Sequence, residues 1–299
     1  MNILVIGSKG FIGSHIYQHF APQHQVWSCD VAVDYVAPNY YQIDATNSDF
    51  KTIFSEQSFD VCINCSGAAS VPDSLKNPLR DFTLNTLNVF RILDAIRQYQ
   101  PTCRFINFSS AAVYGNPQRL PIQENDPLKP LSPYGLHKLA AENICQEFQT
   151  HYGISTCSLR VFSAYGEGLS KQLFWDLFQK TQQIQPVSIY GTGQESRDFI
   201  YIKDLVQIVE LIANNPHFTP TVINVANGEE ITIEKAVQTF FALFQQPIEY
   251  QFTRQQRAGD PLNWVADIKH LKQLGYVQQY SLADGLKNYY QWSQQFVSK

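Results

Sequence analysis

The chain has 299 residues, of which 44% are hydrophobic and 16% are charged, so it can bury a full core and is not a disordered protein. Its net charge is −4 and its basic residues are scattered, which excludes a nucleic-acid or anionic membrane surface and confines any phosphate binding to a pocket. No apolar stretch approaches the ~18 residues of a membrane span, so we expect a cytoplasmic protein without a membrane partner.

The first predicted element is a buried parallel strand over residues 2–6, which a glycine-rich turn connects to a helix. Gly7, Gly10 and Gly13 give this turn the spacing G-x-x-G-x-x-G. Without Cβ atoms, the turn can be tight, its backbone N–H groups can approach a pyrophosphate, and the helix can pack closely on the strand. The turn therefore predicts a phosphate site for a dinucleotide.

A second strand over residues 25–29 is followed by Asp30. An acid at this position accepts hydrogen bonds from the adenine ribose and repels a 2′-phosphate, so Asp30 favours NAD over NADP. Lys9 has the opposite tendency, because a cation beside the second glycine can pair with a 2′-phosphate. A third strand over residues 40–43 leads to Asp44, for which an ordinary loop or helix-capping role is the alternative to cofactor binding.

The next strand, over residues 60–65, contains Cys62 and Cys65. Side chains three apart on a strand point to opposite faces of the sheet, so we expect no metal shared between them. Six cysteines in a chain of this length are typical of reduced thiols in a cytosolic enzyme. A long helix with a regular apolar pattern is then predicted over residues 78–97.

The stretch from Ser109 to Lys138 carries the predicted chemistry. A short apolar strand leads to Ser110, and Tyr134 and Lys138 lie four residues apart at the start of a helix, on one face of it. Ionising a tyrosine at neutral pH requires a pKa fall of about 3 units, or roughly 4 kcal/mol. An ammonium about 5 Å away at an effective dielectric of ~20 supplies roughly 3 kcal/mol of this. We therefore predict that Ser110, Tyr134 and Lys138 are the catalytic group.

The Ser-Ser-Ala-x-Val-Tyr-Gly run from Ser109, the Tyr134/Lys138 spacing and the glycine turn together resemble the extended short-chain dehydrogenase/reductase family. The similarity is greatest to its NAD-dependent nucleotide-sugar epimerases and dehydratases, especially the UDP-galactose 4-epimerase type, and covers nearly the whole chain. It implies an α/β fold, a doubly wound parallel (Rossmann) sheet with a smaller C-terminal α+β lobe.

The resemblance also implies how the chain divides. A dinucleotide-binding domain would span residues 1–165, with residues 199–226 returning to it. A substrate-binding lobe would comprise residues 166–198 and 227–299. In relatives, the helices that correspond to residues 78–97 and 134–152 pair with their copies in a second subunit, so the resemblance implies a homodimer.

Two sets of site residues follow from the resemblance. The expected contacts with an NAD cofactor are Gly7, Gly10, Phe11, Ile12, Gly13, Asp30, Asp44, Ala45, Ser66, Gly67, Ala68, Asn85, Ser109, Tyr134 and Lys138. The expected contacts with a nucleotide diphosphate sugar are Ser70, Ser110, Ser163, Arg197, Arg257 and Asp260.

The substrate residues need further comment. In the resemblance, Arg197 and Arg257 hold the diphosphate, because two guanidiniums give bidentate, charge-assisted anchoring. Either arginine could instead form a surface salt bridge, and Asn85 could be an ordinary polar residue on a helix. Ser163 stands where epimerases of the family commonly have asparagine, so its reach toward the substrate differs from theirs.

The implied activity is oxidation and reduction at sugar C4, most simply a 4-epimerase of a nucleotide diphosphate hexose. A reductase of a nucleotide-linked 4-keto-6-deoxy sugar would use the same catalytic residues. Dehydratases of the family carry Asp-Glu where this chain has Ala111 and Ala112. An NAD-sensing binding protein is a further alternative, but that class typically loses the Tyr134 or Lys138 equivalent.

Overall fold

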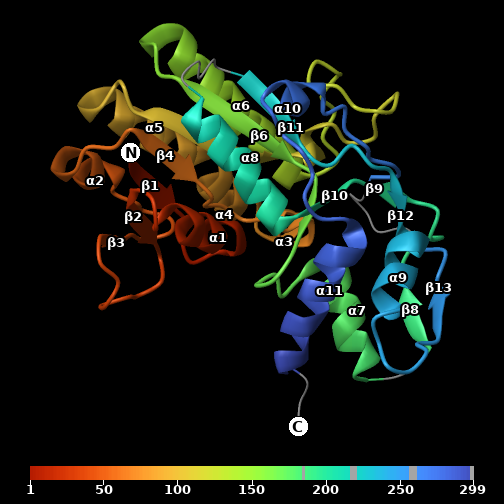
Figure 1. The fold of residues 1–299 in the computed structure, drawn as a ribbon. Helices are drawn as coiled ribbons and strands as arrows, with labels where there is room; N and C mark the ends of the chain where they lie inside the picture. The colour runs from red at the N-terminus through yellow and green to blue at the C-terminus, as the bar shows by residue number, and fades with distance from the viewer. Residues whose placement is uncertain (184–185, 216–220, 256–260, 297–299) are drawn as a thin grey trace.

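The centre of the protein is a sheet of seven parallel strands (Figure 1). The computed structural model describes residues 1–183, 186–215, 221–255 and 261–296. The strands of the sheet are β1 (Asn2–Ile6), β2 (Gln25–Asp30), β3 (Tyr40–Gln42), β4 (Val61–Asn64), β5 (Arg104–Ser110), β6 (Thr156–Val161) and β11 (Thr221–Val225). Their order is β11-β6-β5-β4-β1-β2-β3, and every neighbouring pair is parallel.

Helices cover both faces of this sheet, as its strands require. Side chains alternate along β1, so Ile3 and Val5 pack into one hydrophobic cluster while Leu4 and Ile6 pack into another. The first cluster includes side chains of α1 (Phe11–Phe20) and α8 (Ile202–Asn214), and the second includes side chains of α2 (Phe50–Glu56), α5 (Asn88–Tyr99) and α6 (Pro133–Tyr152). The predicted doubly wound fold is confirmed.

The strand order reverses beside β1, because the chain runs outward to β2 and β3 and then crosses back to β4. The carboxyl ends of β1 and β4 are therefore neighbours, and this is the crevice in which doubly wound sheets bind ligands. Gly7 follows β1 and Ser66 follows β4 at this edge. Cys62 lies in the second cluster and Cys65 packs against the first, so the two thiols do point to opposite faces.

The segment predicted as one helix over residues 78–97 is interrupted. It begins as α4 (Pro78–Phe82) after the short helix α3 (Val71–Lys76), widens into a π-helical turn over Thr83–Leu87, and continues as α5. A π turn adds a residue to one helical turn and frequently marks a functional site. Here the π turn contains Asn85.

A smaller α+β lobe lies to one side of the sheet (Figure 1). Aromatic rings fill its interior, and the centroids of Phe174 and Phe240 are 5.5 Å apart. Its helices include α7 (Gln172–Thr181), α9 (Ile233–Phe241) and α11 (Leu282–Ser293), and α10 (Lys269–Gln273) contacts β11 of the sheet. Its strand pairs are β8 (Val187–Ile189) with β13 (Tyr250–Phe252) and β9 (Ser196–Arg197) with β12 (Ile231–Thr232). The pair of β7 (Ser163–Tyr165) with β10 (Phe199–Tyr201) is formed by residues just outside the segments expected for the lobe.

Within the described ranges, none of the helices combines the length and the apolar character needed to cross a bilayer.

Candidate active site

The turn after β1 requires glycine at two positions, because a Cβ there would collide with neighbouring backbone atoms. Gly7 has φ +80°, and a Cβ on it would lie 2.7 Å from the Ser66 backbone nitrogen. A Cβ on Gly13 would lie 2.1 Å from the Gly7 carbonyl oxygen. Helix α1 begins directly after the turn at Phe11, so its first N–H groups are available to an anion. The turn fits the pyrophosphate of a dinucleotide.

Asp30 lies at the end of β2 beside this turn. Its carboxylate accepts the backbone N–H of Lys9 at 2.7 Å and that of Val31 at 2.7 Å. The acid expected to select the ribose is therefore hydrogen-bonded to the phosphate turn itself. Asp44 has a more local role, because its carboxylate accepts the N–H groups of Thr46 and Asn47, and these bonds lower its pKa.

The small residues after β4 form the opposite wall. Gly67 has φ +124°, and a Cβ on it would lie 2.5 Å from Asn85 Oδ1. Asn85 donates from Nδ2 to Asp81 at 3.1 Å, but its Oδ1 is buried without a partner among the described residues. A buried, unpaired acceptor is costly, and a donor on a bound ligand would satisfy it. These features fit a dinucleotide lying along the edge between β1 and β4.

The three predicted catalytic residues come together. Ser110 ends β5, and the helix that carries Tyr134 and Lys138 starts at a Ser132 cap, whose hydroxyl accepts the Gly135 N–H at 3.2 Å. The Ser110 side chain neighbours Tyr134 and favours its ionised form. Lys138 is buried, its Nζ donates to the Phe108 carbonyl at 2.8 Å, and the same atom lies 6.0 Å from the centroid of the Tyr134 ring.

The predicted substrate residues that the structure describes come from several separate elements. Ser70 caps α3, and the Ser163 N–H donates to the Asp198 carbonyl beside the lobe. Arg197 donates to the carbonyls of Ser196 and Leu262, and its guanidinium lies 5.8 Å from the Trp264 ring. Arg257 and Asp260 lie outside the described residues.

Comparison with known proteins decides the family. The family model described as the NAD dependent epimerase/dehydratase family matches residues 3–226. The chain belongs to this family. NAD is its cofactor, and the resemblance to the extended short-chain dehydrogenases is confirmed.

Individual relatives of this NAD-dependent epimerase/dehydratase extend over its full length. An uncharacterized UDP-glucose epimerase of Bacillus subtilis is 30% identical, with 96% of both chains covered. A UDP-glucuronic acid 4-epimerase from Bacillus cereus, solved with UDP-glucuronic acid and NAD, is 26% identical with a TM-score of 0.90 and 99% of both chains covered. A UDP-N-acetylglucosamine 4-epimerase from Methanobrevibacter ruminantium M1, solved with UDP-N-acetylmuramic acid, is 26% identical with a TM-score of 0.89 and 98% of both chains covered.

Burial is the largest influence on the pKa values of Tyr134 and Lys138 in the predicted catalytic group. Burial raises the pKa of Tyr134, and the hydrogen bond from Ser110 opposes the rise. Burial also lowers the pKa of Lys138 to about 8, against the attraction of Asp81, Cys65 and Glu142. The expected fall in the Tyr134 pKa is therefore absent, because burial of the phenol outweighs the influence of Ser110.

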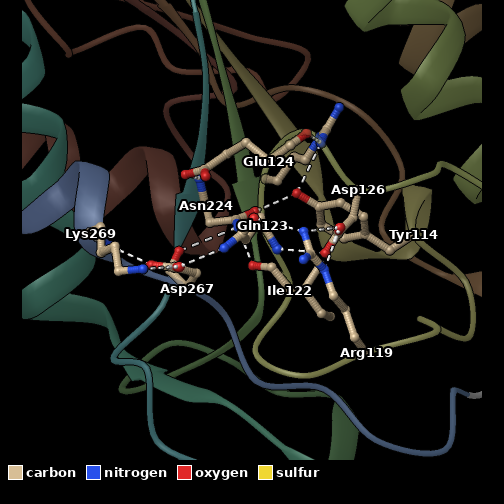
Figure 2. Close-up of polar contacts among 10 residues, drawn as sticks. Tyr114, Arg119, Ile122, Gln123, Glu124, Asp126, Asn224, Asp267 and Lys269 are labelled. Carbon is tan, nitrogen blue, oxygen red and sulfur yellow. Dashed lines mark hydrogen bonds and ion pairs between the residues drawn. The ribbon is translucent and has the colours of Figure 1, made fainter.

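Sequence reasoning missed a buried polar network behind the catalytic loop. The Ser109 hydroxyl donates to Glu142 Oε1 at 2.5 Å, and Arg160 pairs with Glu142 through a 2.7 Å contact between Nη2 and Oε2. Arg160 also donates to the Tyr114 hydroxyl at 2.9 Å, which in turn donates to Asn224 at 2.6 Å, as Figure 2 shows for the last pair.

Two signals for this network were present in the sequence. Glu142 lies four residues after Lys138, on the same face of the helix, and Arg160 is a charged residue within a buried strand. The Ser109 hydroxyl is already engaged by Glu142. The expected contact between Ser109 and the cofactor therefore stays a prediction.

Proposed function

We propose that this protein is an NAD-dependent 4-epimerase of a nucleotide diphosphate hexose. The observation that carries the proposal is the grouping of Ser110, Tyr134 and Lys138 at the carboxyl edge of the sheet, next to the glycine turn. A proton acceptor and a dinucleotide cradle at one edge suit the oxidation of a secondary alcohol. The similarity to two 4-epimerases over nearly the full length of the chain supports this reaction class.

Each catalytic residue has one task in this reaction. Tyr134 removes the proton of the C4 hydroxyl, and Ser110 hydrogen-bonds the same oxygen. Lys138, fixed by the Phe108 carbonyl, places its ammonium beside the Tyr134 ring and favours the phenolate. Bound NAD would accept the C4 hydrogen as hydride, and the positive charge of its nicotinamide ring would further favour the phenolate. Tyr134 then returns its proton when the 4-keto sugar is reduced on its other face.

Conversion without added cofactor tests the proposal. Purified protein would be incubated separately with UDP-glucose, UDP-glucuronic acid and UDP-N-acetylglucosamine, and the C4 epimers resolved by chromatography. We expect one substrate to reach equilibrium with its C4 epimer with no NAD added, and mass spectrometry of the denatured protein to detect released NAD. Turnover that requires stoichiometric reduced cofactor would instead identify a one-way 4-ketoreductase.

We also propose that the lobe of residues 166–198 and 227–299 binds the substrate, with Arg197 and Arg257 on the diphosphate. Arg197→Ala should weaken UDP binding roughly ten- to a hundredfold, because a hydrogen bond to a charged group contributes about 1.5 to 3 kcal/mol. NAD affinity should barely change. Calorimetric titration with UDP and with NAD measures both.

The control for this prediction is Arg97→Ala, which removes an exposed guanidinium on α5 that pairs with Asp94. It should leave UDP affinity unchanged. If Arg197→Ala binds UDP as tightly as Arg97→Ala does, or loses NAD affinity equally, Arg197 serves the fold or the cofactor site instead.

We propose that the protein forms a homodimer through α4, α5 and α6. Large apolar side chains are exposed on these helices, among them Leu79, Phe90 and Leu136. α5 and α6 pack against each other, so two such faces would bury one another as a four-helix bundle. Light scattering should give twice the chain mass of 34.1 kDa, and a monomer mass at micromolar concentration would contradict the proposal.

The cytoplasm is the compartment we propose for this reaction. All six cysteines are free thiols, five of them buried, which suits a reducing compartment. Cell fractionation with an antibody against the protein would test this, and recovery outside the cytosolic fraction would contradict it.

A further inference from the structure

The loop after β2 folds back onto the phosphate turn through one ion pair. Asp34 Oδ2 lies 2.5 Å from the ammonium nitrogen of Lys9. The other oxygen of Asp34 accepts the backbone N–H groups of Val36 at 3.1 Å and Ala37 at 2.9 Å, so the loop itself orients the carboxylate. The Lys9 hydrogen bond is the largest contribution to the lowered pKa of Asp34.

Lys9 is held on a second side by Tyr40. Its ammonium lies 5.2 Å from the centroid of the Tyr40 ring, at a distance typical of cation–π contacts. The Tyr40 hydroxyl donates to the carbonyl of Ala32 in the same loop. The ammonium is therefore directed into the loop by both a carboxylate and an aromatic ring.

The ion pair lies beside Asp30, the acid expected to bind the cofactor ribose. The backbone N–H of Lys9 donates to Asp30 Oδ2 at 2.7 Å, so the backbone of Lys9 is in direct contact with Asp30. The Asp34 carboxylate thus pairs with the Lys9 ammonium, while the Asp30 carboxylate accepts the Lys9 backbone N–H. The three side chains together carry a net charge of −1, which repels an added phosphate.

We propose that Asp34 is a second determinant of cofactor selectivity, which excludes NADP by occupying the Lys9 ammonium, a cation that could otherwise bind a 2′-phosphate next to Asp30. Asp30 repels the phosphate directly, whereas Asp34 acts through Lys9. The inference rests on the NAD cofactor of the family and is independent of the reaction at C4.

Asp34→Asn is the sharpest test, because an asparagine Oδ1 can still accept the Val36 and Ala37 N–H groups while the charge is lost. We expect the ratio of the NADP and NAD dissociation constants to fall roughly tenfold, mostly through tighter NADP binding, as the freed ammonium forms a charge-assisted bond to the 2′-phosphate. Calorimetric titration of protein freed of bound nucleotide measures both constants. Because the site is partly exposed, the gain should shrink as salt is raised from 0.05 M to 0.5 M.

Two further variants decide whether Lys9 is the mediator. In a Lys9→Gln background, Asp34→Asn should change the ratio several-fold less than it does in the wild type. Asp49→Asn, which removes a carboxylate that caps α2, should leave the ratio unchanged. The proposal would be overturned if Asp34→Asn left the ratio of the two dissociation constants unchanged, including by an equal change in both. It would also be overturned if NADP binding tightened equally with and without Lys9.

Discussion

Replacing Tyr134 by phenylalanine should lower turnover by about 10²- to 10⁴-fold while leaving NAD affinity within roughly twofold, because the ring stays and only the ionisable oxygen is lost. Ser110 neighbours Tyr134 and the Lys138 ammonium lies beside the ring, so the variant keeps both neighbours and loses only the proposed base. Initial rates of C4 epimerisation and a calorimetric NAD titration of the same preparation measure both quantities.

Tyr152→Phe provides the matched control for this experiment. Tyr152 is the last residue of α6, the helix that also carries Tyr134, and its side chain is exposed. Its replacement should leave the rate unchanged. If Tyr134→Phe keeps more than a few per cent of the wild-type rate, the proton is removed by another group and the role of Tyr134 is wrong.

The parts of the site that the sequence predicted are those with short-range causes. The glycine turn needs positive φ at Gly7 and no Cβ at Gly13, and only glycine meets both needs at that spacing. Tyr134 and Lys138 share a helix face because they are four residues apart. The doubly wound sheet follows from strands that alternate with amphipathic helices along the chain, and the structure confirms it.

The parts that the sequence left open depend on contacts between distant segments. Ser109 and Glu142 are 33 residues apart, and they meet only because α6 packs against β5. Lys9 pairs with Asp34, which is 25 residues away in the sequence. Its position beside a glycine therefore does not show whether its ammonium is available to a 2′-phosphate. The raised pKa of Tyr134 likewise depends on burial by the whole fold. Residue spacing carries no measure of such desolvation.

The buried pair of Arg160 and Glu142 makes the second large prediction. Both side chains are almost fully buried, and Glu142 also accepts the hydroxyl of Ser109, which is adjacent to the proposed catalytic residue Ser110. Arg160→Met should lower the free energy of unfolding by about 3 to 5 kcal/mol, because it leaves an uncompensated carboxylate inside the protein. Urea unfolding followed by fluorescence measures the loss.

The double variant Arg160→Met with Glu142→Gln separates charge from packing. It should recover most of the lost stability, because the neutral amide still accepts the Ser109 hydroxyl and no buried charge remains. Arg119→Met is the surface control, since Arg119 pairs with Asp126 (Figure 2) but is itself exposed, and it should cost less than about 1 kcal/mol. If Arg160→Met costs no more than Arg119→Met, the carboxylate of Glu142 is not held as a charge. In that case, Arg160 and Glu142 would help to position Ser110 relative to Tyr134 through packing and not through their charges.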